Sequence, residues 1–476
     1  MVFTSPVFIF LFLPVFITLY FGAREKYRNY FLILSSLIFY FWAEPKFIFV
    51  ALASLVIDWY LGNRIFIAPP PQKKIWLALL ISINVALLVY FKYTNFFVQN
   101  LNDLLLKTGG GTIHWTHIAL PLGLSFIVFE KITYGFDIYK GIGKPARTLS
   151  LYLVYTLLFP KLIAGPIVKY HEIENQLESR KILFRDILYG IFRFAIGLAK
   201  KVWVANTLGI IVDRTFQLPP SSLTFFQSWI GIFCFTFQIY FDFSGYTDMA
   251  IGLTRIAGFR IKENFNFPYV SVSFTDFWRR WHISLSTWIK EYLYIPLGGN
   301  RRSNARTYFN LWLCFIICGF WHGANWPFVF WGFYNGIFLI LDKVIWLDIS
   351  KRLPKICNIA ITFLFVVIGW VFFRSPSMQY AYAYLSKMCS FSDLLTGSTQ
   401  SLIYVGHEVI SLLGIAFLVS FLPARKTTQD RYERFLETAL QGYHAYPLQL
   451  ASFFLIAFSL VKISTAHFAP FIYFRF

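Results

Sequence analysis

Two histidines of this chain lie in apolar stretches, where a side chain able to carry a proton is unusual. His322 lies in the stretch GFWHGANW (residues 319–326), and His282 lies in FWRRWHISLSTW (residues 277–288). Imidazole titrates near neutral pH, so it suits the general base that takes the proton from an attacking hydroxyl during acyl transfer. A second polar group can orient that base or stabilise the oxyanion. Two buried histidines can supply both roles of an acyl-transfer site if the fold brings them together, which their separation of 40 residues does not show. The alternative for each is a packed, hydrogen-bonded histidine of the core.

The segment around His282 has the spacing of one helix over residues 276–291, with Asp276 at its N-cap. Trp278, His282 and Ile289 share the apolar face of that helix. We therefore expect the His282 ring to be buried, and Trp278 is a candidate to support or bind a substrate.

His322 is expected at a break between two helices. The apolar helix before it runs into Gly323, and Asn325 is placed to cap the next helix with Pro327 in its first turn. A ring at such a break can face a cavity and touch both a substrate hydroxyl and a neighbouring polar group. Asn325 and Trp321 are therefore candidates to support the base.

Several charged residues lie within apolar segments, where an unpaired charge is costly. Most are expected to pair with neighbours and hold helices together. Asp242 and Asp248 are also candidates to support the site. The full set is Asp58, Glu130, Lys131, Asp137, Lys161, Asp242 and Asp248.

Two apolar segments are expected to break and line a cavity. Residues 159–167 contain two prolines and a glycine, and each proline removes a backbone donor. In residues 241–248, polar side chains cluster at the end of an apolar run. Broken backbone at membrane depth is tolerated only against protein or a water-filled cavity.

The composition predicts an all-α polytopic membrane protein. Of 476 residues, 57% are hydrophobic and only 14% are charged, more apolar surface than a soluble core of this size can bury. We expect a single integral-membrane domain over residues 1–476, with about 11–14 transmembrane helices plus re-entrant or amphipathic helices in residues 242–305. The candidate spans are residues 5–21, 29–43, 47–62, 75–92, 118–138, 148–168, 186–212, 223–241, 307–322, 326–346, 357–373, 402–422 and 447–463.

The formal charge of +20 arises from short basic clusters between apolar runs, which argues against a nucleic-acid partner. Clusters such as residues 24–28 alternate with connections poor in positive charge, such as residues 44–46. By the positive-inside rule, the first loop faces the cytoplasm and the N-terminus lies outside. A basic cytoplasmic face attracts anionic membrane lipid or an anionic acyl donor.

The five cysteines predict neither a disulfide framework nor a metal site. Cys314 and Cys318 share a helix face, but no nearby histidine or carboxylate completes a metal-ligand set. We therefore expect no metal at the site.

Long aromatic-rich motifs in consistent order over almost the whole chain resemble the membrane-bound O-acyltransferase superfamily. The similarity is to the branch of the alginate O-acetyltransferase membrane subunit. Lys290 and Glu291 depart from that pattern, which has Arg-Asp there, and Arg475 stands where glutamine is common. The stretches that carry the resemblance are residues 277–288, 292–301 and 319–326, supported by 121–126, 159–166, 240–248, 369–374 and 471–476.

The resemblance implies a helical fold around a central tunnel or funnel, with His322 as catalytic residue and His282 as its motif partner. It implies an acyl group, with acetyl preferred, taken from a cytoplasmic thioester such as acetyl-CoA, with no permanently bound cofactor. The acyl group crosses the bacterial cytoplasmic (inner) membrane toward an exported polysaccharide of alginate, cellulose or peptidoglycan type. A periplasmic acyltransferase is the implied partner.

Two other classes of function remain open from the residues. A transporter or flippase of a cell-envelope precursor would use Asp242 and Asp248 to carry coupling ions. A structural scaffold for a secretion complex would tolerate substitution of both histidines. Acyl turnover from a labelled thioester distinguishes the enzyme from both.

Overall fold

The computed structural model describes residues 1–391, 405–424, 445–465 and 471–472, and all regular structure among them is helical. Six described helices are long and apolar enough to cross a membrane, and two shorter apolar helices accompany them. The predicted all-α membrane architecture is confirmed. The six are Ile48–Ile67, Pro70–Lys107, Phe184–Gln217, Trp326–Ser350, Lys355–Arg374 and Ala445–Thr465, and the shorter two are Val7–Gly22 and His407–Phe421.

These six are fewer than the 11–14 spans expected, because several expected spans form shorter helices. Helix α2 (Arg28–Ala43) has 16 residues, α6 (Leu124–Lys140) has 17 and α7 (Leu149–Leu157) has 9. A straight crossing of the hydrocarbon core needs about 20 residues. The apolar runs are present, but the helices that they form end before that length.

The described chain forms two compact units, Met1–Ile191 with Met249–Lys262, and Phe192–Asp248 with Glu263–Phe476. Helices α10 (Phe184–Ala199) and α12 (Phe225–Ile256) contribute residues to both. The expected single domain stays a prediction, and so does the tunnel.

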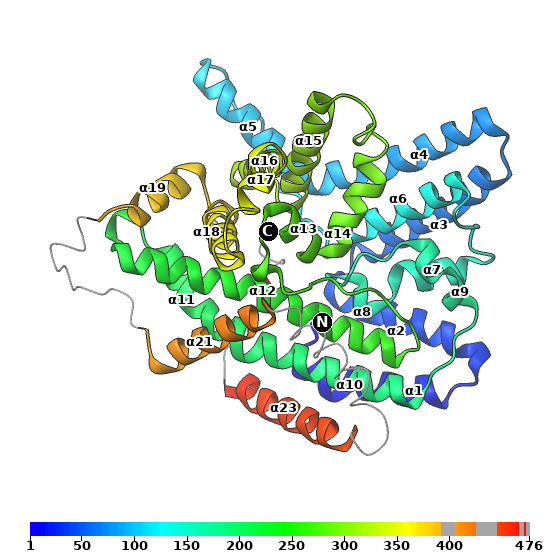
Figure 1. The fold of residues 1–476 in the computed structure, drawn as a ribbon. Coiled ribbons are helices and arrows are strands. Elements are labelled where there is room, and N and C mark those ends of the chain that lie inside the picture. The colour runs from blue at the N-terminus through cyan, green and yellow to red at the C-terminus, as the bar shows by residue number, and fades with distance from the viewer. Residues whose placement is uncertain (392–404, 425–444, 466–470, 473–476) are drawn as a thin grey trace. The chain divides into compact units, whose positions relative to one another are not determined.

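In the first unit, α6 packs against two neighbouring long helices, α3 and α4, and the three lie side by side in Figure 1. The bounds of the other helices are α1 (Leu13–Gly22), α3 (Ile48–Ile67), α4 (Pro70–Leu88), α5 (Thr94–Lys107), α8 (Phe159–Leu162) and α9 (Tyr170–Glu178).

Buried ion pairs join the helices of this unit, as expected. Lys131 Nζ lies 2.8 Å from an Asp58 carboxylate oxygen, and both side chains are fully buried. Asn84 donates a hydrogen bond of 2.8 Å to the same carboxylate. Glu130, the residue before Lys131 on α6, pairs instead with Lys161. Each of these four buried charges therefore meets an opposite charge from another helix.

The expected break in residues 159–167 is confirmed. Helix α7 ends at Leu157, Leu158 has the non-helical angles φ −48° and ψ 104°, and α8 is a single turn that begins at Phe159. The break turns the Lys161 side chain toward Glu130, so it serves the buried ion pair.

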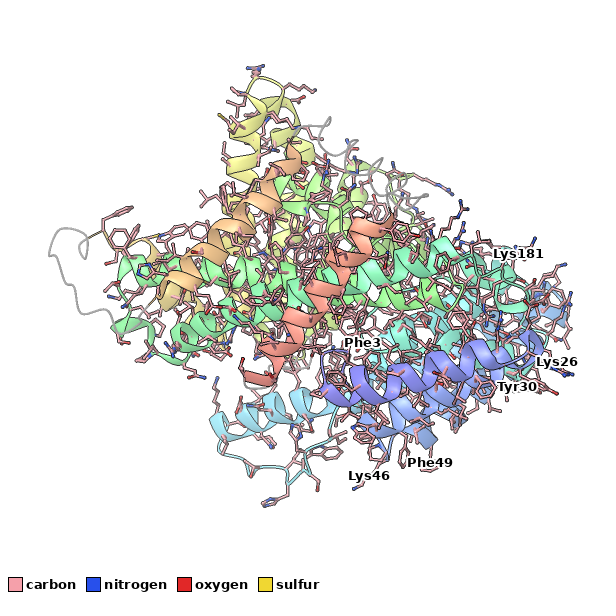
Figure 2. All side chains as sticks on the ribbon, turned by 90° about the horizontal axis from the view of Figure 1, so that it is seen from below. Phe3, Lys26, Tyr30, Lys46, Phe49 and Lys181 are labelled. Carbon is pink, nitrogen blue, oxygen red and sulfur yellow. The ribbon has the colours of Figure 1, made fainter. Side chains whose placement is uncertain are left out.

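Two lysines of the first unit, Lys26 and Lys181, lie on one side of it (Figure 2). Figure 2 shows Lys26, after α1, and Lys181, after α9, on the same side, while Lys46 lies beside Phe49 elsewhere. This distribution fits the expectation that residues 24–28 and 44–46 face opposite sides of the membrane, although the cytoplasmic assignment stays a prediction.

In the second unit, α15 (Asn304–His322) packs along α16 (Trp326–Leu341), and α16 contacts α13 and α18. Three π-helical segments interrupt the α-helices: η4 (Lys200–Ala205), η7 (Ile289–Tyr294) and η8 (Asp342–Trp346). The other helices are α11 (Asn206–Gln217), α13 (Phe274–Arg280), α14 (Ile283–Trp288), α17 (Leu347–Ser350), α18 (Lys355–Arg374), α19 (Met378–Met388), α21 (His407–Phe421) and α23 (Ala445–Thr465).

The expected break over residues 241–248 is wrong, because these residues lie inside the continuous helix α12. Within the second unit, cations from an adjacent segment neutralise the carboxylates. Lys201 Nζ lies 2.9 Å from Asp242, and Lys200 Nζ lies 2.7 Å from Asp248. With its charges paired, the helix has no need to unwind toward water.

Candidate active site

His282 lies at a sharp backbone turn between two short helices, so the expected single helix over residues 276–291 is wrong. Helix α13 ends at Arg280, and His282 has φ 45°, in the left-handed region. Left-handed backbone is uncommon for residues other than glycine and persists only where surrounding structure enforces it. The N-cap of α13 is Ser273, whose hydroxyl accepts from the Asp276 backbone N–H, so Asp276 itself is not the cap.

Asn264 enforces this turn from outside the motif. Its backbone carbonyl accepts from the Ile283 N–H at 2.9 Å. Its side-chain oxygen accepts from both the N–H and the hydroxyl of Ser284, at 3.1 and 2.9 Å. These bonds satisfy donors at the start of α14 that have no partner within the helix. The spacing of residues around His282 carries no signal for this contact.

The geometry determines the protonation of the His282 ring. Its Nδ1 lies 3.2 Å from Asn264 Oδ1, an oxygen that already accepts from Ser284, so Nδ1 must carry the hydrogen. The Nε2 atom has no hydrogen-bond partner among the described residues. His282 is fully buried and lies outside the six candidate spans, and burial lowers its pKa to about 3. The ring is therefore neutral, with the lone pair on Nε2.

His322 is the last residue of α15, and the expected helix break is confirmed. Gly323 is the C-cap of α15, and Pro327 lies in the first turn of α16. Close packing of the two helices depends on Gly319 and Gly332. A Cβ on Gly319 would lie 2.2 Å from the Phe328 carbonyl oxygen, so no larger residue fits there.

Aromatic rings surround the His322 imidazole, which is 6% exposed. The ring centroids of Trp321, Trp331 and Phe373 lie 4.9, 5.2 and 5.3 Å from it. Such a cluster keeps the dielectric low and holds the imidazole in one orientation.

The structure brings the two histidines against one indole. The Trp321 ring lies 4.9 Å from the His322 ring and 6.4 Å from the His282 ring. The Trp278 ring joins this group through Trp331, with the two ring centroids 5.6 Å apart. Its Nε1–H donates to Asn335 at 3.3 Å. His282, His322, Trp321 and Trp278 thus belong to one cluster, although 40 residues separate the histidines in sequence.

Asn325 and the two aspartates lie apart from this cluster. Asn325 occupies the N-cap position of α16 as expected, but its side chain makes no capping bond and donates to the Pro376 carbonyl at 3.1 Å. Asp248 pairs with Arg193 and Lys200. Asp242 does not contact His282 directly, but it precedes Phe243, whose ring lies 4.7 Å from the His282 ring. Support of the reaction by these residues stays a prediction.

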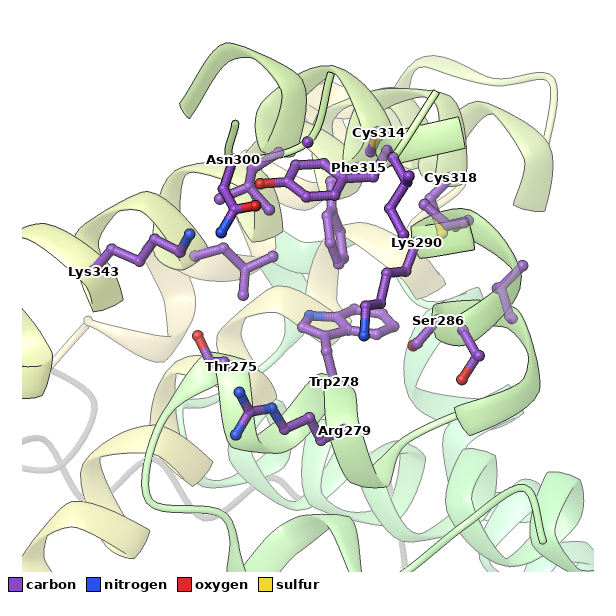
Figure 3. Close-up of a pocket in the computed structure, with 18 of the residues that line it drawn as sticks. Thr275, Trp278, Arg279, Ser286, Lys290, Asn300, Cys314, Phe315, Cys318 and Lys343 are labelled. Carbon is purple, nitrogen blue, oxygen red and sulfur yellow. The ribbon is translucent and has the colours of Figure 1, made fainter. Parts of the chain in front are cut away.

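A cavity of about 610 Å³ lies beside the cluster (Figure 3). Trp278, Phe315 and Cys318 form part of its apolar wall, and neither histidine is among its lining residues. Cys318 stands one helical turn before His322 on α15, so the cavity approaches the cluster along that helix.

Four cations line the same cavity: Arg279, Lys290, Arg301 and Lys343. In Figure 3 the Lys290 and Lys343 side chains extend toward the space above Trp278 from different sides. Lys290 is one of the positions at which the sequence departs from the pattern it resembles. An apolar wall with several cations suits an amphipathic, anionic ligand.

The chain is similar to proteins of known family. Residues 145–381 match the model of the membrane-bound O-acyltransferase family. The chain is 37% identical to a probable alginate O-acetylase of Pseudomonas putida over 490 aligned residues, covering 100% of both chains. It is 38% identical to a peptidoglycan O-acetyltransferase of Helicobacter pylori, covering 82% of this chain and 80% of the relative. It is 29% identical to a teichoic acid D-alanyltransferase of Bacillus subtilis, over 54% of this chain and 70% of the relative. The chain therefore belongs to the membrane-bound O-acyltransferase family.

Proposed function

We propose that this acyltransferase takes an acetyl group from a cytoplasmic thioester donor and moves it across the membrane for O-acetylation of an exported polysaccharide. The observation that carries the proposal is the meeting of His282 and His322 at Trp321, beside a cavity lined by cations. The relatives named for alginate and peptidoglycan acetylation support an acceptor of the alginate or peptidoglycan type, and cellulose remains a further candidate of the proposal.

His322 acts in this proposal as the general base. It removes the proton from the attacking hydroxyl as oxygen forms a bond to the thioester carbonyl, and the thiol departs with the carbon–sulfur bond electrons and a proton. A base in a site with little water need not release a hydration shell before it reacts. His282, neutral and with its lone pair on Nε2, orients a proton-bearing group beside it rather than contributing charge.

The cavity suits the donor. Its volume of about 610 Å³ lies in the range of small-molecule sites. Lys290, Lys343 and Arg279 would bind the phosphates of a coenzyme A thioester, and the apolar wall at Trp278 and Cys318 would bind its acyl arm. Trp278 contacts Trp331, which contacts His322, so in this proposal the acyl arm extends past these two rings to bring its carbonyl to the base.

The relatives, rather than the fold, support our proposal for the place of reaction. The alginate, peptidoglycan and teichoic acid relatives are named for polymers of the bacterial envelope. We place the chain in the bacterial cytoplasmic membrane, with a periplasmic acyltransferase as the partner that completes transfer to the polymer.

The transporter alternative is not favoured. Asp242 and Asp248 would have to bind coupling ions, yet each is held by a lysine within 3 Å. Cation-gradient-dependent uptake without acyl turnover would reverse this ranking.

The decisive experiment is complementation of a deletion strain with His322→Ala, followed by mass spectrometry of the surface polymers. We expect acylation to be abolished while the protein remains inserted and abundant. His114→Ala, an exposed histidine of the loop after α5, is the matched control and should acylate normally. Normal acylation by His322→Ala would remove His322 from the mechanism.

A further inference from the structure

We infer that Phe471 and Ile472, near the C-terminus, hold the His282 imidazole in place through Asp242 and Phe243, and so act as positioning residues for the reaction. The inference rests on the role proposed for His282 and extends it to a segment far along the chain. All of the groups concerned belong to the second unit.

Asp242 anchors the C-terminal segment. It is 1% exposed, and one carboxylate oxygen lies 2.9 Å from Lys201 Nζ. Its other oxygen accepts from the Ile472 backbone N–H at 2.9 Å. Because both oxygens of a buried carboxylate are engaged, the position of Ile472 is tied to helix α12.

The anchor places the Phe471 ring on α12, next to the residues that face His282. Phe471, 4% exposed, stacks on Tyr246 with ring centroids 4.8 Å apart and lies 5.9 Å from Phe243. Phe243 is fully buried and meets His282 edge to face, with centroids 4.7 Å apart and planes at 87°. The contacts thus run without interruption from Ile472 to the imidazole.

His282 needs such support because its backbone is strained. A histidine at φ 45° is stable only when its surroundings leave it no other conformation. Asn264 holds Nδ1, and Phe243 packs on the ring. Loss of the Phe471 ring would leave space behind Phe243, and the imidazole could then turn away from the Trp321 side.

The first test measures His282 directly, by mass spectrometry of hydrogen exchange at the imidazole C2 position in full-length protein. In Phe471→Ala we expect exchange at His282 at least about tenfold faster than in wild type, because the buried ring becomes accessible. Exchange at His171, in the other unit, should not change. Phe458→Ala removes the same side chain from a surface position that is 59% exposed, and it should leave exchange at His282 unchanged.

Two further variants separate the effect of the Asp242–Ile472 hydrogen bond from that of the Phe471 ring. Ile472→Pro removes the backbone N–H that donates a hydrogen bond to Asp242. This change should accelerate exchange at His282 as Phe471→Ala does. Phe471→Leu keeps most of the volume and should give an intermediate rate. Exchange at His282 that stays at the wild-type rate in both Phe471→Ala and Ile472→Pro would overturn the inference.

Kinetics then separate positioning from a general structural role. Phe471→Ala should lower kcat for acyl transfer by about tenfold with little change in KM for the donor, since a misplaced group costs rate rather than binding. In a His282→Ala background the same change should have almost no further effect. A full tenfold loss there would show that Phe471 acts independently of His282 and would contradict the inference. The exchange measurement does not depend on acyl transfer, so failure of the proposed function would show in His322→Ala and not in these rates.

Discussion

The ion pairs of the first unit and the histidine cluster of the second unit differ in how their buried polar groups are held. In the first unit, Asp58 faces Lys131 and Glu130 faces Lys161, so each of these four buried charges meets an opposite charge from another helix. In the second unit, the His282 ring is enclosed by aromatic side chains, its Nε2 has no hydrogen-bond partner among the described residues, and its backbone is left-handed.

Under the proposed function, the ion pairs of the first unit hold structure together and the histidine cluster of the second unit carries out the chemistry. A matched buried pair stabilises the particular packing of its helices, because removal of one partner leaves a buried charge. A strained residue with an unsatisfied polar atom costs stability and is retained where a reaction uses it. We therefore expect changes in the first unit to affect stability and changes in the histidine cluster to affect rate.

The largest expected effect on rate is that of His322→Ala in purified protein. Loss of a general base should lower acyl turnover by about 10²- to 10⁴-fold, while the melting temperature changes by only a few degrees. Turnover of a radiolabelled thioester and thermal unfolding in detergent measure the two. If turnover fell only in proportion to a large loss of stability, the histidine cluster would not differ from the ion pairs of the first unit in the way proposed.

The largest expected effect on stability is that of Lys131→Met. It leaves the Asp58 carboxylate buried opposite a neutral side chain and should destabilise the protein by about 3–5 kcal/mol. The double variant Asp58→Asn/Lys131→Met should recover most of this loss, because no unpaired charge remains. Equal melting temperatures for wild type and Lys131→Met would show that the pair does not stabilise the unit.

Asn264→Leu should lower kcat by about 10- to 100-fold, since the Nδ1–H of His282 loses the acceptor that sets its tautomer. The pH dependence of stability provides an independent check. The pKa of His282 is lowered from 6.5 to about 3 in the folded protein, so below pH 6.5 the unfolded chain binds a proton that the fold excludes.

His282 therefore contributes stability at neutral pH that is lost as the pH falls from about 6.5 toward 3, with a slope of about 1.4 kcal/mol per pH unit. His282→Gln should reduce this slope in thermal or denaturant unfolding. Identical slopes for the two proteins would show that the ring is accessible to protons in the fold.

The smallest effects are expected at the cavity. Lys290→Ala and Lys343→Ala should each raise KM for a coenzyme A thioester several-fold with kcat little changed, and the effect should weaken in high salt. Lys351→Ala, at an exposed residue paired with Asp348, is the control. Unchanged KM in both cavity variants would place the donor elsewhere.

Much of the site follows from local sequence patterns. Gly323 and Pro327 predict the helix break at His322 because a glycine cap and a proline in the first turn act over a few residues. Burial of His282 follows from its apolar neighbours. The break at His282 does not follow, because Asn264 enforces it from 18 residues away. The continuity of α12 through Asp242 was missed for the same reason, since the lysines that neutralise its carboxylates come from η4.

By itself, the sequence determined that the surroundings of the protein are a membrane, because 57% of its residues are hydrophobic. It also determined the kind of chemistry available, because imidazoles in apolar stretches can move protons. It also determined that buried charges would pair, because lipid gives them no other partner. Tertiary structure alone decided the partners. Glu130 and Lys131 are adjacent in sequence, yet helical geometry points them in different directions, toward Lys161 and Asp58. In the same way, only the packing of α13 to α16 brought His282 and His322 to one indole, because contacts between distant residues depend on how helices pack rather than on their spacing along the chain.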